Sequence, residues 1–168
     1  MPAVIQKNVA RRTLRTTAST VKIKMTNNMT QIHAYLSFGG QCREAMTFYQ
    51  ECLGGDLSLQ TIEGSPMEAQ CPPGIKHQIL HSSLTKNGMI LMASDLAAPG
   101  SFIKGNNFAL SVNCSSEEEI NTFFNRLAKG GKIIDPLKIQ FWGAMFGVLN
   151  DKFGVRWMFN YDMNQHLD

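Results

Sequence analysis

The chain has 168 residues, of which 43% are hydrophobic and 17% are charged, and its formal net charge is +3. This length suits one ordinary domain, and the composition is that of a globular protein rather than a disordered or fibrous one. The charge is unevenly distributed: residues 1–29 hold six of the 16 basic side chains and no acidic one. Residues 30–168 therefore carry ten basic side chains against 13 acidic ones. This balance predicts no nucleic-acid partner, because such binding needs a basic face on the folded part.

The N-terminal segment, residues 1–29, is rich in Arg, Lys, Ser and Thr and contains only isolated apolar residues. No apolar run reaches the ~7–15 residues of a secretory signal or the ~18 residues of a spanning helix. We therefore predict a cytoplasmic protein with no membrane partner. The segment is interpreted as a basic, disordered leader or as an over-extended reading frame that starts at Met25 or Met29. An organellar transit peptide is the alternative.

The cysteine pattern indicates free thiols. The chain has four cysteines with no CxxC pair and no following His at zinc-finger spacing. Three of them fall inside expected helices or strands, where a reduced cysteine behaves as a small apolar residue. The four are Cys42, Cys52, Cys71 and Cys114.

The first half of the chain alternates between strand-like and helix-like patterns. The expected helix ends at Gly54-Gly55, and Asn87-Gly88 is a strong hairpin-turn signal. In chain order we expect a strand over 31–38, a helix over 41–53, a strand over 57–62, a loop over 63–76 and hairpin strands over 78–84 and 89–94.

The second half repeats this order after a linker over residues 95–106. Ser115 or Ser116 is expected to cap the second helix, with acidic residues 117–119 at its positive end. The expected elements are a strand over 107–114, a helix from 115 or 116 to about 129, and strands over 132–134, 144–150 and 155–161.

Three segments recur along the chain, and this internal repeat defines the domain organisation. Residues 47–49 recur at 122–124, the Gly pair 54–55 recurs at 130–131, and residues 88–92 recur at 154–158. We predict an α+β fold of two tandem βαβββ modules. Module one covers about 31–94 and module two about 107–162, within a single domain over 30–168.

Several motifs of this repeat are similar to those of the PhnB-like branch of the vicinal oxygen chelate superfamily. They lie at residues 35–40, 42–49, 91–95, 141–147 and 151–161, so the resemblance covers residues 31–162. The superfamily includes glyoxalase I, extradiol dioxygenases and bleomycin- and fosfomycin-resistance proteins. The resemblance implies a curved mixed sheet around a central cavity, a small-molecule site within the concave sheet, and a homodimer.

The resemblance also implies four positions at which enzymes of the superfamily hold a divalent metal. Carried onto this chain, they are His33 and Met92 in module one, and Asn107 and Met158 in module two. The repeat pairs residue 33 with 107 and residue 92 with 158. Only His33 is a competent ligand, because a thioether and a neutral amide bind such metals poorly. We therefore expect no metal site of the superfamily type and no cofactor, while a divalent metal is the lesser alternative.

Candidate cavity residues follow from the strand alternation and from the resemblance. On the first strand, His33 and Tyr35 alternate with residues suited to packing on the helices. His33 is expected either to hydrogen-bond to a neighbour such as Tyr35 or Asn107, or to contact a ligand. The predicted cavity residues are His33, Tyr35, His81, Met92, Asn107, Trp142, Arg156 and Met158.

Two of these residues have alternative interpretations. Trp142, beside Gly143 at a strand entrance, forms a wall of the pocket or a dimer contact, or it packs in the core. Arg156 attracts an anionic ligand, or it is a solvated surface residue. Trp157 and Phe159 are expected in the core.

Three functions follow from these observations. The first is a metal-independent protein of the PhnB-like group that binds a small, partly apolar molecule in its cavity, with catalysis left open. The alternative is a metal-dependent lyase or dioxygenase that uses His33, His81 and a carboxylate such as Glu63 or Glu68. The third is the ubiquinone-pathway methyltransferase function attached to relatives of this sequence. It is disfavoured because Gly39-Gly40 is not a GxGxxG loop and the chain lacks a βαβαβ series.

Overall fold

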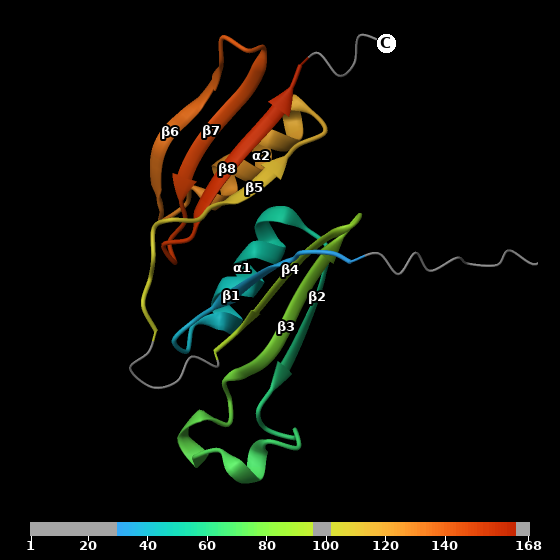
Figure 1. Ribbon diagram of the computed structural model, residues 1–168, viewed down its shortest axis with the longest axis vertical. Coiled ribbons are helices and arrows are strands. Elements are labelled where there is room, and N and C mark those ends of the chain that lie inside the picture. Colours follow the sequence, from blue (N-terminus) through green and yellow to red (C-terminus); the bar gives the residue numbers. More distant parts are fainter. Residues whose placement is uncertain (1–29, 96–101, 164–168) are drawn as a thin grey trace, which may run out of the picture. The chain divides into compact units, whose positions relative to one another are not determined.

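The computed structural model describes residues 30–95 and 102–163 (Figure 1). The leader predicted over residues 1–29 and residues 96–101 of the predicted linker lie outside the described residues. The first module contains β1 (Ala34–Ser37), α1 (Cys42–Leu53), β2 (Asp56–Thr61), β3 (Ile79–Lys86) and β4 (Met89–Ser94), with 3-10 turns at Glu68–Gln70 and Pro73–Ile75. The second module contains β5 (Leu110–Asn113), α2 (Glu117–Leu127), β6 (Lys132–Ile139), β7 (Ala144–Asn150) and β8 (Arg156–Asp162). The prediction of an α+β fold with two βαβββ modules is confirmed.

Each module forms one four-stranded mixed sheet, and the two sheets have the same topology. The strand orders are β1-β4-β3-β2 and β5-β8-β7-β6. In each sheet the first strand runs parallel to the last strand of its module, and the remaining neighbours are antiparallel. Each sheet therefore has one edge formed by a short first strand, β1 or β5.

The register of these strands corrects one pairing taken from the repeat. Tyr35 lies opposite Met92 in the first sheet, and Ser111 lies opposite Met158 in the second. Met92 and Met158 are therefore equivalent, as expected. The counterpart of His33 is Ala109, two residues before Ser111, so the pairing of residue 33 with Asn107 is wrong. Asn107 is exposed and precedes β5.

The helices form as their apolar stripes predict, and each covers one face of its sheet. The buried positions of α1 are Cys42, Ala45, Met46, Tyr49, Cys52 and Leu53, and those of α2 are Ile120, Phe124 and Leu127. Ser116 caps α2, because its hydroxyl accepts a hydrogen bond of 3.1 Å from the Glu119 amide. At α1 the cap comes from far along the chain: the Asp95 carboxylate accepts from the amides of Gly40 and Cys42, each at 2.9 Å.

A buried carboxylate joins the two modules. The Tyr49 hydroxyl of α1 donates to Asp151 Oδ2 at 2.7 Å, and Trp157 Nε1 donates to the same oxygen at 2.8 Å. The amides of Phe153 and Val155 donate to Asp151 Oδ1 at 2.9 and 3.0 Å. Because burial raises the pKa of Tyr49 above its usual range, with further contributions from Asp151, the phenol keeps its proton and remains the donor. Trp157 and Phe159 are buried, as predicted.

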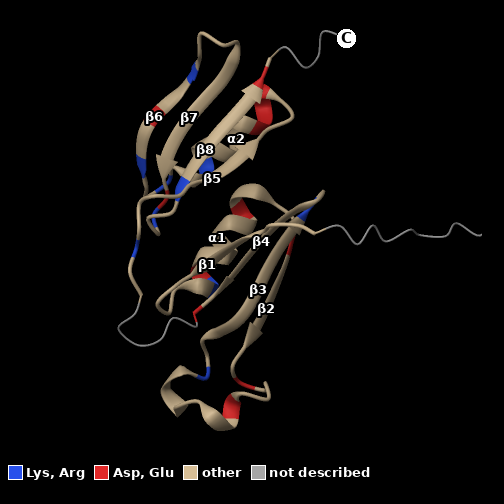
Figure 2. Ribbon diagram, in the orientation of Figure 1, with Lys and Arg blue, Asp and Glu red and all other residues tan. Residues whose placement is uncertain are grey.

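Among the described residues, no helix is long and apolar enough to cross a membrane. Lys and Arg are interspersed with Asp and Glu in both modules (Figure 2).

Candidate functional site

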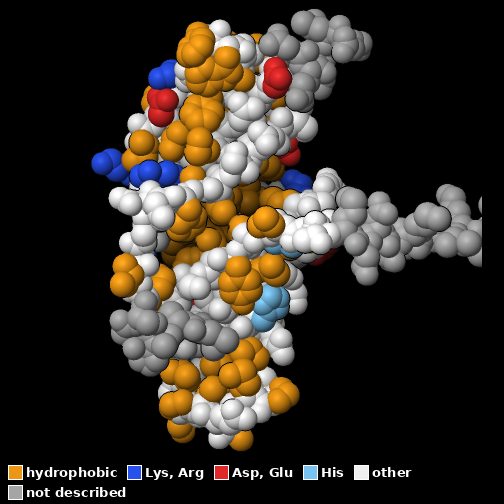
Figure 3. Space-filling view, viewed as in Figure 1, with side chains coloured by type: hydrophobic (Ala, Val, Ile, Leu, Met, Phe, Trp, Pro, Cys, Tyr) orange, Lys and Arg blue, Asp and Glu red, His pale blue; other side chains and the backbone are white. Residues whose placement is uncertain are grey.

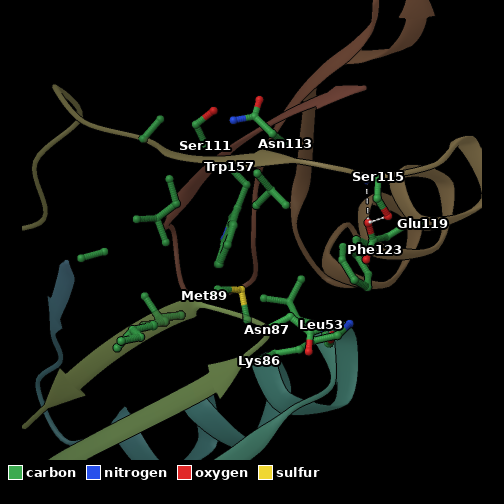
Figure 4. Close-up of a pocket in the computed structure, with 16 residues that line it drawn as sticks. Leu53, Lys86, Asn87, Met89, Ser111, Asn113, Ser115, Glu119, Phe123 and Trp157 are labelled. Atoms are coloured by element: carbon green, nitrogen blue, oxygen red, sulfur yellow. Dashed lines mark hydrogen bonds between the residues drawn. The ribbon is translucent and has the colours of Figure 1, made fainter. Parts of the chain in front are cut away.

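A pocket of about 620 Å³ lies where residues of the two modules meet (Figure 4). Its volume falls within the range of small-molecule sites. The first module contributes Ala34, Leu53, Lys86, Asn87, Met89, Ile90 and Leu91, and the second contributes residues 109–113, Ser115, Glu119, Phe123 and Trp157. We call this cavity the junction pocket.

The junction pocket has an apolar body and a polar rim. Trp157 extends from β8 toward Met89, while Ser111 and Asn113 point to the other side of β5 (Figure 4). On the rim, Lys86 Nζ donates to the Leu53 carbonyl at 2.7 Å and lies 4.8 Å from the centre of the Phe123 ring. Because this cation already has partners within the protein, the pocket suits a ligand that is largely apolar.

One wall of the junction pocket is a strand edge. Residues 109–113 all line it, although their side chains alternate between the two faces of the sheet. Within the described residues, β5 pairs with β8 alone, so its other edge faces the pocket. Backbone amide and carbonyl groups are therefore available there as hydrogen-bonding partners for a ligand.

The eight predicted cavity residues, all of which the structure describes, lie outside the lining of the junction pocket. Five of them lie on the sheet faces turned away from the helices, which we call the open faces: Tyr35, His81 and Met92 in the first sheet, and Arg156 and Met158 in the second. Trp142 lies in the turn between β6 and β7. His33 and Asn107 precede the first strands of their modules.

On the first sheet the structure brings Tyr35 and His81 together. The Tyr35 hydroxyl lies 3.2 Å from His81 Nδ1, and the ring centres are 5.8 Å apart. Met92 is the direct neighbour of Tyr35 on β4. The partner of Tyr35 is thus His81 rather than His33, and a phenol–imidazole pair can exchange or share a proton with a polar ligand.

On the second sheet Trp142 belongs to an aromatic group rather than to the core. Its side chain is 50% exposed, and its ring centre lies 4.8 Å from that of Phe141 and 6.1 Å from that of Phe146. Arg156 donates from Nε to Asn150 Oδ1 at 3.1 Å. Sequence reasoning missed Phe146 and Asn150, although the alternation along 144–150 placed both on one face.

The described residues do not fit the divalent metal of the superfamily. Over residues 30–95 and 102–163, no three His, Cys, Asp or Glu side chains are grouped to hold an ion. Glu68, a ligand in the alternative function, instead binds Lys76 Nζ at 2.9 Å and the Gly64 amide at 2.8 Å. His81 is engaged with Tyr35.

Buried cysteines do not supply a nucleophile. Burial raises the pKa of Cys42 and of Cys52 to about 11 and that of Cys114 to about 12. These thiols therefore stay protonated near neutral pH, and the thiolate is the reactive form. All four cysteines are free, as the sequence predicted.

Two tandem βαβββ modules with open mixed sheets define the PhnB-like class of the glyoxalase/bleomycin-resistance/dioxygenase fold. The chain belongs to the family described as 3-demethylubiquinone-9 3-methyltransferase, whose model matches residues 30–159. The described residues form two mixed sheets, whereas a Rossmann-type methyltransferase has a doubly wound parallel sheet.

Relatives and solved structures support this class. Protein YjdN of Escherichia coli is 36% identical over 135 residues, which is 75% of this chain and 91% of YjdN. Protein PA1353 of Pseudomonas aeruginosa is 39% identical with a TM-score of 0.71, covering 80% of this chain and 98% of that one. A PhnB protein of Bacillus cereus, described as a 3-demethylubiquinone-9 3-methyltransferase, is 32% identical with a TM-score of 0.64, covering 79% and 99%. A glyoxalase-related enzyme of Fulvimarina pelagi shares the fold, at 20% identity and a TM-score of 0.53, covering 79% and 88%.

Proposed function

We propose that this PhnB-like protein binds a small, partly apolar molecule without the metal site of its superfamily. The observation that carries the proposal is the junction pocket of about 620 Å³, with its apolar body and polar rim. Binding sites for small molecules are typically concave and mostly apolar, with a few polar groups that orient the ligand. Catalysis is not part of this proposal.

The free edge of β5 supports the same proposal. A ligand in the junction pocket meets backbone groups of β5 on one side and the side chains of Trp157 and Met89 on the other. Apolar contact then supplies most of the affinity, and the strand edge supplies directional hydrogen bonds.

Filling the junction pocket tests the proposal. Ala109 is half-buried and lines the pocket, whereas Ala69 is exposed on the Glu68–Gln70 turn. We expect the purified protein to bind the neutral apolar dye Nile red, Ala109→Phe to weaken this binding about tenfold, and the control Ala69→Phe to leave it unchanged. Native mass spectrometry is expected to find a co-purifying molecule that Ala109→Phe loses. Equal dye binding by both variants, with no such molecule, would contradict the proposal.

Metal analysis tests the second half of the proposal. We expect the purified protein to contain no stoichiometric divalent ion, because His33 has no second competent ligand at the equivalent positions. A stoichiometric ion that disappears in His33→Ala would instead favour the metal-dependent lyase or dioxygenase.

We also propose that the protein is a homodimer, as its class implies. Three isoleucines on the edge strand β6, namely Ile133, Ile134 and Ile139, are 46–63% exposed. Hydrophobic side chains gather over the β6–β7 part of the second module (Figure 3). Such patches often mark protein interfaces. Light scattering after gel filtration is expected to give a dimer for the natural protein and a monomer for Ile139→Lys, and a monomeric natural protein would refute this proposal.

A further inference from the structure

The open face of the second sheet carries side chains in ordered rows. The register places Phe146 beside Asn160, Val148 beside Met158, and Asn150 beside Arg156. All six side chains point away from α2, because Gly147 between them approaches Phe124 of that helix. They are half-buried, so a ligand lying on this face can reach each of them.

One end of these rows is aromatic. Trp142 projects from the turn before β7, and its ring packs edge-on against Phe146 at a centre-to-centre distance of 6.1 Å. The planes of the two rings are inclined by 67°, so they offer one flat surface and one edge to a planar ligand. The neighbouring Phe141 is 97% exposed, which leaves this end open to solvent.

The other end of the rows is cationic. Within the described part of the chain, Arg156 has one hydrogen bond, from Nε to Asn150. The two terminal amino groups of its guanidinium can therefore donate hydrogen bonds to both oxygens of a carboxylate. Arg156 also lines a small pocket of about 30 Å³ with Asn150, Asn106 and Phe108, and the described lining contains no carboxylate.

A second cation lies beside the same small pocket. Gly154 belongs to its lining, and Lys104 Nζ lies 3.8 Å from the point where a side chain on Gly154 would begin. A volume of 30 Å³ exceeds what one water needs and suits the head of a carboxylate. Two cationic side chains, Arg156 and Lys104, therefore lie at or beside the lining of this small pocket.

The first sheet differs at the corresponding places. Its four strands carry only two charged residues, Asp56 and Lys86 (Figure 2). Its open face presents Tyr35, His81 and serines. The combination of exposed aromatic rings and an available guanidinium is therefore specific to the second module, although both modules have the same backbone plan.

We propose that the open face of the second sheet binds a planar aromatic molecule that carries a carboxylate. The ring packs against Trp142 and Phe146, the middle of the ligand crosses Val148 and Met158, and the carboxylate reaches Arg156. We call these five residues together with Asn150 the aromatic–arginine strip. The inference rests on the proposed function only in that the ligand is a small molecule, because no residue of the strip lines the junction pocket.

The strip also sets the length of the ligand. Phe146 and Asn150 are four residues apart on β7, which corresponds to about 13 Å along the strand. Because Phe146 and Asn150 mark the aromatic and cationic ends, a ring joined to its carboxylate by a short chain fits better than one that carries the carboxylate directly.

The experiment uses 2-naphthoate and its homologues with one to four methylenes between ring and carboxylate, each paired with the neutral alcohol of the same length. Affinities are measured by calorimetry, and the indole N–H signals of Trp142 and Trp157 are followed by NMR. We expect the Trp142 signal to shift while that of Trp157, which donates to Asp151, stays in place. We expect an affinity maximum at an intermediate length and about tenfold weaker binding of the alcohols.

Two variants test separately how the cationic end and the aromatic end of the strip contribute to binding, and two further variants serve as controls. Arg156→Gln is expected to weaken acid binding about tenfold and leave alcohol binding unchanged, while Trp142→Ala weakens both. Arg156→Lys should restore part of the preference for acids, and Arg43→Gln, an exposed residue of α1, should bind as the natural protein does.

Three outcomes overturn the inference: an unchanged acid-to-alcohol ratio in Arg156→Gln, no binding of any homologue, or a shift of the Trp157 signal alone. The last outcome places the probe in the junction pocket and supports the proposed function. The Nile red measurement remains an independent test of that function. Failure of the aromatic–arginine strip to bind can therefore be distinguished from failure of the junction pocket to bind.

Discussion

At the scale of single residues, the carboxylate of Asp151 has the greatest structural effect. It accepts four hydrogen bonds, two from buried side chains and two from backbone amides. A buried carboxylate is stable only when its oxygens are satisfied, and here each oxygen has two donors. One residue of the β7–β8 turn thus orders that turn, the Trp157 indole and the Tyr49 hydroxyl of α1.

Replacing Asp151 by Ala is expected to destabilise the protein by about 2–4 kcal/mol, because the buried Tyr49 hydroxyl and Trp157 indole lose their acceptor. Urea unfolding monitored by circular dichroism measures this loss. Asp135→Ala, which removes an exposed ion pair with Lys138, is the control and should lower the free energy of unfolding by less than about 0.5 kcal/mol. Equal losses in the two variants would show that the four hydrogen bonds contribute no special stability.

The buried thiols predict how stability depends on pH. The pKa of Cys114 rises from 9.0 to about 12 on folding, and those of Cys42 and Cys52 rise to about 11. Above pH 9 the unfolded chain releases these protons before the folded chain does, so the free energy of unfolding falls as the pH rises toward 12. Urea unfolding between pH 7 and 10.5 should therefore give a free energy of unfolding that is first constant and then declines. In Cys114→Ala this free energy should decline less steeply with pH, and a slope equal to that of the natural protein would contradict the raised pKa of Cys114.

At the scale of elements, the Gly pair after each helix explains why this motif recurs. A side chain on Gly131 would begin 2.3 Å from the Asn150 carbonyl, and one on Gly55 would begin 2.5 Å from the Thr85 carbonyl. In both modules the chain leaving the helix passes directly against the backbone of the following hairpin. Only glycine permits this approach.

Gly131→Ala is therefore expected to destabilise the protein by about 2 kcal/mol or more, since the backbone of the β7–β8 turn must shift. The matched control is Gly74→Ala, whose added methyl group meets open space. Thermal unfolding measures both variants. A Gly131→Ala protein as stable as Gly74→Ala would refute the close approach as the reason for this glycine.

Local patterns predicted the order of the elements well but placed some of their ends poorly. The strand expected over 132–134 extends to Ile139 as β6, through Asp135 and Pro136. Proline is tolerated there because β6 is an edge strand with register shifts against β7. The expected strand over 107–114 shrinks to β5, and this shift misaligned Asn107 with His33.

At the scale of the whole molecule, the junction pocket could not be predicted from the sequence. Leu53, Lys86 and Phe123 are far apart in the chain, and their periodicities indicate only that each lies in a helix or strand. The predicted cavity residues came partly from the alternation within strands, as for Tyr35, and partly from the resemblance, as for Met92 and Met158, and all three lie on sheet faces turned away from the helices. How two modules meet depends on contacts such as Tyr49–Asp151, which no local pattern specifies.

The two modules are expected to unfold together, because buried groups of both share the Asp151 carboxylate. Native-state hydrogen exchange should give the amides of the central strands β3 and β7 opening free energies within about 1 kcal/mol of each other. In Asp151→Ala the two values should separate. Unequal protection in the natural protein would mean that each module opens independently.

The separation of each sheet into a helix-covered face and an open face has an evolutionary consequence. Substitutions on the open faces leave the cores behind them unchanged, so two duplicated halves can acquire different surface chemistry while keeping one folding plan. The phenol–imidazole pair of the first sheet and the aromatic–arginine strip of the second illustrate such divergence. A gene duplication of this kind yields two surfaces that selection can modify separately within one polypeptide.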